Sequence, residues 1–167
     1  MTDPQQSPLA VPNLSGTLLR PPDPGYDEAR RVFNGMIDRS PALIARCRDS
    51  GDVAAVVNMA REQQLPLSVY GGGHGVTGSA VVDAGICVDL REMRAIEVDA
   101  DARTAQVAGG CTWGEVDAAT QQHGLAFTGG RMSSTGVAGL AVGSGTPHNH
   151  ALRPHTQEPR PPSQLHT

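Results

Sequence analysis

The chain has 167 residues, enough for one domain with a hydrophobic core but too few for the two-domain build of many cofactor enzymes. Its formal net charge is -4 and it contains no run of lysine or arginine, so we expect neither nucleic acid nor a membrane surface as a partner. The three cysteines form an odd set without C-x-x-C spacing, and no leader pattern or long apolar run occurs. We therefore expect a cytoplasmic protein without disulfides.

Prolines divide the chain into three parts, because most of them lie near its two ends. We expect a disordered N-terminal tail over residues 1–22, an ordered domain over residues 23–145, and a disordered Pro/His-rich tail over residues 146–167. The second tail carries four histidines but no cysteine or carboxylate cluster. No metal site is expected.

The first half of the ordered domain has the pattern of a βαβ unit. An Asp-Pro signal and apolar residues four positions apart predict a helix from about Tyr26 to Ile37. PALIARC, residues 41–47, is typical of a buried strand, and DVAAVVNMAREQQ, which begins at Asp52, is typical of an amphipathic helix. LPLSVY, residues 65–70, is the next strand. This order predicts a parallel sheet.

The second half predicts further strands and one more helix. Residues 86–90, 95–99 and 104–110 are short runs of strand-forming residues, and the short polar link between the last two predicts a hairpin. Thr112 with Glu115 three positions later is a capping-box pattern, so a helix should begin there. The fold class is therefore α+β, with a small parallel βαβ sheet followed by antiparallel strands.

The stretch PLSVYGGGHGVTGS leads from a strand into five glycines and one histidine, His74. The glycines satisfy G-x-G-x-x-G, but too few residues separate Gly78 from Ile86 to hold the crossover helix of a dinucleotide-binding βαβ unit. No Gly-Lys-Ser/Thr follows, which excludes a Walker loop. The loop can still bind an anion, such as a pyrophosphate, through its backbone N–H groups. His74 could be a nucleophile, a hydrogen-bonding group, or a loop histidine bonded to the backbone.

A second glycine-rich stretch, GGRMSSTGVAGLAVGSG, begins at Gly129 and ends at Gly145. Six glycines in this stretch predict another close approach of the backbone to a ligand or to another segment. A plain surface loop is the alternative.

Five stretches occur in one order between about Pro22 and Gly145: YDEARRVFNGMI, PALIARC, GGGHGVTG, GGCTWGEVDAATQQHGLA and GGRMSSTGVAGLAVG. Together they resemble the flavin domain of berberine-bridge-type FAD-linked oxidases, which have the PCMH-type FAD-binding domain of the vanillyl-alcohol-oxidase superfamily. The resemblance implies the N-terminal part of such a domain, with FAD as the cofactor. It also implies oxidation of an alcohol-type or amine-like carbon, often with dioxygen reoxidising the flavin.

The resemblance also implies the site residues. In the family the first glycine loop wraps the FAD pyrophosphate and its histidine bonds to the 8α carbon of the flavin, so His74 is the expected attachment residue. Met132 stands where many relatives have a cysteine that makes a second bond, and a thioether has no thiolate for that reaction. The cofactor-binding residues implied are Gly71, Gly72, Gly73, His74, Gly75, Gly78, Ser79, Gly130, Ser134, Thr135, Gly136, Val137 and Gly139.

The resemblance stops near Gly145, where relatives continue into the rest of the flavin domain and the substrate domain. A frameshift or a truncated gene is the expected explanation. Such a fragment would lack the catalytic base, so no catalytic residue is assigned, and its exposed strand edges would favour self-association. Three functions stay open: an FAD-linked oxidoreductase, a non-catalytic fragment that binds FAD weakly or not at all, and a small anion-binding module unrelated to flavin.

Overall fold

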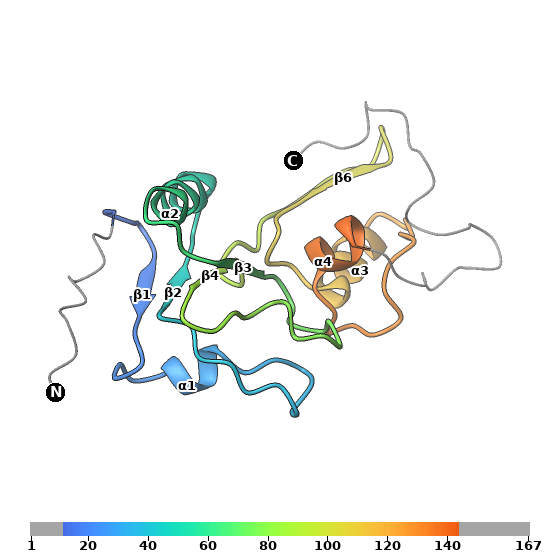
Figure 1. Ribbon diagram of the computed structural model, residues 1–167. Helices are drawn as coiled ribbons and strands as arrows, with labels where there is room; N and C mark the ends of the chain where they lie inside the picture. Colours follow the sequence, from blue (N-terminus) through green and yellow to red (C-terminus); the bar gives the residue numbers. More distant parts are fainter. Residues whose placement is uncertain (1–11, 144–167) are drawn as a thin grey trace, which may run out of the picture.

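The computed structural model describes residues 12–143, which form a mixed four-stranded sheet, a separate antiparallel strand pair and four helices (Figure 1). The elements confirm the expected α+β class. In chain order they are β1 (Thr17–Leu19), α1 (Tyr26–Ala29), β2 (Leu43–Arg46), α2 (Ser50–Glu62), β3 (Leu67–Tyr70), β4 (Ile86–Asp89), β5 (Ile96–Asp99), β6 (Thr104–Val107), α3 (Trp113–Gln121) and α4 (Val137–Val142).

The four-stranded sheet has the order β1-β2-β4-β3. Strand β4 pairs in parallel with both β2 and β3, and β1 pairs antiparallel with β2. All four residues of β4 are buried, which explains why its sequence, ICVD, shows no alternation of apolar and polar residues. The βαβ unit is therefore present, with β4 inserted between its two strands.

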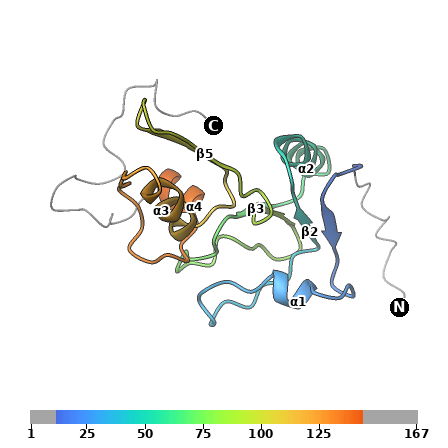
Figure 2. The same cartoon turned by 180° about the vertical axis from the view of Figure 1, so that it is seen from behind.

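Two apolar clusters cover the two faces of this sheet. Helix α2 packs on one face through Val56, Met59 and Ala60, and α1 packs on the other through Tyr26 and Ala29. The two helices lie on opposite sides of the strands in Figure 1. The predicted hairpin is also present: β5 and β6 pair antiparallel and project away from the sheet in both views (Figures 1 and 2).

The N-terminal part of the domain begins earlier than the prolines predicted. Strand β1 lies within the stretch 1–22 that was expected to be a tail, and its pairing with β2 adds an edge strand to the sheet. The expected tail over 146–167 and residues 1–11 lie outside the described residues. The proline pattern was thus wrong about residues 17–19, because three residues suffice for an edge strand.

The helix expected from Tyr26 to Ile37 is also much shorter than predicted, since α1 ends at Ala29. Beyond it the backbone N–H of Phe33 donates to the carbonyl oxygen of Gly73, 3.0 Å away, instead of to a helical carbonyl. A tertiary contact with the first glycine loop has therefore replaced the last two turns of the helix.

The carboxylate of Asp52, in the first turn of α2, joins that helix to the segment before β1. It accepts hydrogen bonds from the backbone N–H groups of Ser15 at 2.8 Å, Gly16 at 3.1 Å and Arg48 at 2.9 Å. These bonds, the one from Arg48 foremost, hold the pKa of Asp52 below its usual value. The charged form of Asp52 is therefore part of what fixes β1 to the domain.

Replacing Asp52 with asparagine should lower the free energy of unfolding by about 1–3 kcal/mol at neutral pH, because an amide nitrogen would face backbone donors. The contribution of the carboxylate is complete above its unfolded pKa of about 4 and is lost as the pH falls through its lower folded pKa. Urea unfolding at several pH values should show the difference between wild type and Asp52→Asn shrinking below about pH 4. Asp101→Asn, at an exposed turn, is the control; an unchanging difference would contradict the prediction.

The three cysteines are buried and unpaired. Burial raises the pKa of Cys47 and of Cys87 to about 12, and it also raises the pKa of Cys111. All three side chains are consequently thiols at neutral pH and poor nucleophiles. Within residues 12–143, no helix is long and apolar enough to cross a bilayer.

Candidate functional site

The two glycine-rich stretches lie against each other, backbone to backbone. A Cβ atom built on Gly72 would overlap the backbone nitrogen of Gly136, and one built on Gly136 would overlap the backbone nitrogen of Gly72. The first stretch follows the carboxyl end of β3, and the second leads into α4, which lies beside α3 in both views (Figures 1 and 2). Part of the predicted close approach is therefore between the two loops themselves.

The start of α3 fixes the second loop. The N–H of Trp113 donates to the carbonyl of Thr135 at 3.0 Å, and the N–H of Val137 donates to the carbonyl of Cys111 at 2.9 Å. The predicted capping box of Thr112 and Glu115 is present at this helix start. These bonds give the segment before α4 a defined position.

Helix α4 is a feature that the sequence did not predict. The stretch was expected to make a close backbone approach, with a plain surface loop as the alternative, and neither interpretation included the helix that Val137–Val142 forms. Gly139 has no atom within 4 Å of a Cβ built on it, so its position inside this exposed helix is not explained by packing within the described residues. Gly130, by contrast, lies against the indole of Trp113.

His74 lies where three segments meet. Its ring stacks on Phe33, with 4.5 Å between the ring centroids and 18° between the planes. Its Nε2 atom is 3.2 Å from the hydroxyl oxygen of Ser134 in the second loop. The side chain is half-buried rather than turned inward to the core. His74 therefore contacts side chains of two other segments. It is not a histidine bonded only to the backbone of its own loop.

The backbone of the first loop carries a run of unused hydrogen-bond donors. Among the described residues, the N–H groups from Gly71 to Thr77 donate to no protein acceptor, whereas the next N–H, that of Gly78, donates to Gly75. Gly71 to His74 are buried or half-buried, and N–H groups in such positions are rarely left without an acceptor, whereas Gly75 to Thr77 are exposed. Successive N–H groups in a loop of this kind form a concave anion site. The loop therefore fits a pyrophosphate group.

Glycine is required inside this loop for more than one reason. Gly73 has a φ of 67°, in the left-handed region, and its Cα lies against the phenol of Tyr70. Gly75 is different, because the nearest atom to a Cβ built on it is the Ser79 hydroxyl at 3.7 Å, an ordinary contact. Contacts within the protein thus explain why Gly72 and Gly73 are glycines. No such contact explains Gly75, which has open space beside the free N–H groups.

A partly buried ion pair supports the root of the loop, and no sequence pattern indicated it beyond the proximity of the two residues. Arg91 donates to both carboxylate oxygens of Asp89, at 2.8 and 2.7 Å. The guanidinium lies 4.0 Å from the ring centroid of Tyr70, the last residue of β3. The Tyr70 hydroxyl in turn donates to the carbonyl of Arg31 at 2.6 Å. The segment before Phe33 and the glycine loop are held together by this cluster.

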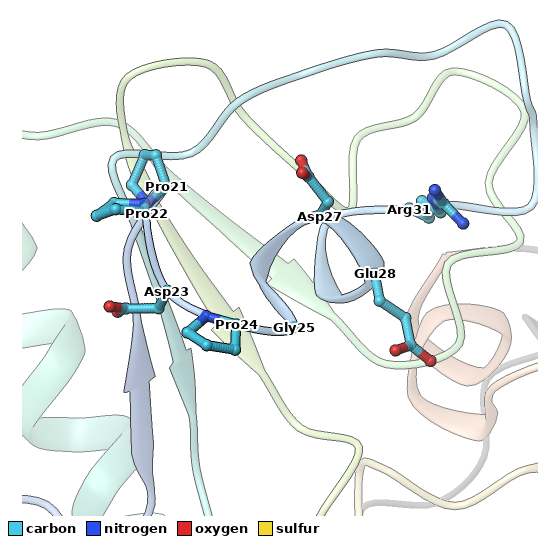
Figure 3. A pocket seen from close by; sticks show the side chains of 8 residues that line it. All are labelled: Pro21, Pro22, Asp23, Pro24, Gly25, Asp27, Glu28 and Arg31. Carbon is cyan, nitrogen blue, oxygen red and sulfur yellow. The ribbon is translucent and has the colours of Figure 1, made fainter.

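A shallow depression lies elsewhere, at the turn between β1 and α1 (Figure 3). It contains no residue of either glycine-rich loop. Asp23 and Asp27, two of its carboxylates, are already engaged: Asp23 accepts the N–H of Arg20 and Asp27 pairs with Arg30. The depression therefore has the chemistry of a local turn and not that of a ligand site.

Residues 41–154 match the family model described as FAD binding domain. (R)-6-hydroxynicotine oxidase of Paenarthrobacter nicotinovorans is 37% identical over 140 residues, which are 83% of this chain and 31% of that protein. The crystal structure of 6-hydroxy-D-nicotine oxidase from Arthrobacter nicotinovorans has a TM-score of 0.79 over 82% of this chain and 30% of its own. Phl p 4, a grass pollen allergen with glucose dehydrogenase activity, has a TM-score of 0.71 at 28% identity, over 77% of this chain and 29% of its own.

The sheet, the hairpin and the paired glycine loops are therefore those of the N-terminal part of a flavin-binding domain. The chain belongs to the FAD binding domain family. It spans about 30% of the length of the relatives it matches.

Proposed function

We propose that this chain provides the pyrophosphate-binding part of the FAD site of an FAD-linked oxidoreductase acting on alcohol-type or related substrates. The observation that carries the proposal is the run of seven backbone N–H groups, from Gly71 to Thr77, without an acceptor among the described residues. Anionic oxygens would satisfy these donors. The cytoplasm stays the proposed compartment, supported by three cysteines that form no disulfide.

We further propose that His74 attaches the flavin covalently, supported by its position in the middle of the donor run. His74 would form a bond from an imidazole nitrogen to the 8α carbon. To balance the bond, His74 would give up its N–H proton and the flavin methyl group one hydrogen. The flavin would take up the two electrons released, and dioxygen would be the final oxidant. When bound, FAD supplies a hydride acceptor for the substrate.

A non-catalytic role is the second candidate, because this chain spans about 30% of relatives that act as whole enzymes. Holding a substrate against a bound flavin requires groups that orient it. We assign no catalytic base among the described residues, so the chain alone has no group identified for that task. In this alternative the chain binds FAD without turnover, or needs another chain to complete the site. Turnover assays with candidate alcohols, amines and sugars, performed on a flavin-loaded preparation, separate the two candidates.

Replacing His74 with alanine should abolish acid-stable flavin. Purified wild-type protein incubated with FAD should keep its yellow colour in an acid-precipitated pellet, because a covalent bond survives denaturation. The His74→Ala pellet should be colourless. His123→Ala, which changes an exposed histidine after α3, is the matched control and should stay yellow.

Colourless pellets from both wild type and His123→Ala would contradict the attachment role. Dissolved FAD and inorganic pyrophosphate then become the probes of the donor run, in a calorimetric titration of the wild-type chain. Binding of pyrophosphate without FAD would favour a small anion-binding module, the third function left open by the sequence.

We also propose that the chain self-associates through β3. This strand is at the edge of its sheet, and its pairing with β4 places Leu67 and Val69 on the face that α2 covers only in part. Val69 is 51% exposed. An exposed apolar edge strand is a template for pairing with another chain, so a second copy is the proposed partner.

Light scattering should give a mass for the wild-type chain that rises with concentration, and Val69→Lys should restore the monomer mass, because an edge lysine opposes pairing. Met36→Lys changes a residue that is 91% exposed and belongs to the segment between α1 and β2, outside any strand, so it serves as the control. A wild-type chain that stays a monodisperse monomer at all concentrations would contradict this proposal.

A further inference from the structure

The imidazole of His74 is held from two directions by residues that lie far from it in the sequence. Phe33 covers one face of the ring, and the hydroxyl of Ser134 reaches Nε2 across 60 positions of the chain. We infer that Phe33 and Ser134 are positioning residues, which fix the plane and the tautomer of His74 before any cofactor arrives. In the favoured tautomer Nε2–H donates to the Ser134 hydroxyl and Nδ1 keeps its lone pair. The function that we give to this arrangement rests on the attachment role proposed above for His74.

Phe33 is not placed by burial in the core. Phe33 is 64% exposed, and its ring stacks on the ring of His74. The backbone position is set by the bond from its N–H to the carbonyl of Gly73, next to His74 in the loop. Tyr70 secures the same segment through the carbonyl of Arg31. An aromatic side chain held in this way limits rotation of the imidazole and shields one face of it from water.

Ser134 is fixed through its neighbours in the chain. The carbonyl of Ser133 accepts the N–H of Gly114 at 2.9 Å, and the carbonyl of Thr135 accepts the N–H of Trp113 at 3.0 Å. Both donors belong to the first turn of α3, so the hydroxyl of Ser134 is carried by a helix start and not by a free loop. The mutual packing of Gly72 and Gly136 sets the distance between the loops.

The direction of the hydrogen bond decides which nitrogen is free. A serine hydroxyl can donate or accept, and within residues 12–143 neither the Ser134 hydroxyl nor Nδ1 of His74 has another hydrogen bond. If Ser134 accepts from Nε2–H, the Nδ1 lone pair is available to a ligand carbon or donor. If Ser134 donates, Nδ1 carries the proton and is not nucleophilic. A nucleophilic His74 whose contact with Ser134 is intact therefore requires the first arrangement.

The tautomer can be measured on the chain without FAD. Long-range ¹H–¹⁵N correlation spectra, recorded at a pH where the imidazole is neutral, distinguish a protonated ring nitrogen from an unprotonated one by its ¹⁵N shift. We expect Nε2 protonated and Nδ1 unprotonated in wild type. Ser134→Ala should lower the ratio of the two tautomers by about two- to tenfold, the contribution of one hydrogen bond, and Ser134→Thr should restore it. Phe33→Leu should remove the ring-current shift of the His74 carbon-bound protons.

A protonated Nδ1 in wild type, or a tautomer ratio that Ser134→Ala leaves unchanged while the backbone spectrum stays folded, would overturn the inference. The same wild-type and variant chains are then incubated with FAD, and covalent flavin is followed with time. The expected tautomer without covalent flavin in wild type means that the attachment proposal has failed while the inference about Ser134 and Phe33 stands. Covalent flavin that forms equally fast in wild type and Ser134→Ala overturns the positioning role alone.

Discussion

Replacing Gly72 with alanine should lower the free energy of unfolding by about 1–3 kcal/mol and separate the two glycine loops, because the added Cβ would occupy the position of the Gly136 backbone. Flexible side chains can often yield to an added methyl group, but here the obstacle is main chain on both sides. Gly136 is tied through the neighbouring Val137 N–H to the start of α3. No nearby side chain can therefore move to relieve the overlap, and the loops must move apart.

Urea unfolding measures the stability of Gly72→Ala, and the ¹⁵N shifts of His74 report whether Ser134 stays in reach. Gly139→Ala is the matched control, since its Cβ would meet open space in helix α4. That control should gain up to about 1 kcal/mol, because alanine is the better helix former. A Gly72→Ala chain as stable as wild type would show that the loops are not packed as the structure has them.

The elements of the fold that the sequence predicted well are those set by local patterns. The capping box at Thr112 placed the start of α3, and the short polar link between two strand-like runs placed the β5-β6 hairpin. The errors occur where a distant segment decides the local structure. Phe33 leaves the helical path because Gly73 offers its carbonyl, and strand β1 exists because β2 supplies the pairing edge. No window of sequence around residues 17–37 contains either partner.

The candidate site shows the same division. The glycine spacing located both loops and His74, because glycine-rich runs after a strand are visible in the sequence. The spacing could not show that Gly72 and Gly136 face each other, since 64 positions separate them in the numbering. It also could not show that Phe33 belongs to the site: in the sequence Phe33 fitted the apolar face of a helix. Contacts between loops depend on the assembled sheet, which the family resemblance implied but did not describe.

Replacing Arg91 with alanine should lower the free energy of unfolding by about 1.5–3 kcal/mol, because the buried carboxylate of Asp89 would lose its two hydrogen bonds from the guanidinium and keep only the backbone N–H of residue 91 and the longer ion pair with Arg46. Asp89 is 1% exposed, at the end of the central strand β4. The nearest other cation is Arg46, whose Nε lies 3.7 Å from the carboxylate, beyond hydrogen-bond distance. Arg91 also donates to the carbonyl of Ala29 at 2.8 Å and covers the ring of Tyr70, so the root of the glycine loop should loosen as well.

Arg94→Ala is the matched control, because its pair with Glu115 has a similar distance of 2.9 Å but lies on the surface. Exposed pairs contribute about 0–1 kcal/mol, so urea unfolding should separate the two variants clearly, and equal losses would contradict the assignment. A double variant, Asp89→Leu with Arg91→Met, tests the cause of the loss. It should recover much of the stability lost in Arg91→Ala, since apolar residues often replace a buried ion pair at little cost. A double variant as unstable as Arg91→Ala would instead mean that Arg91 acts mainly through Ala29 and Tyr70, and the His74 spectra would then report a displaced ring.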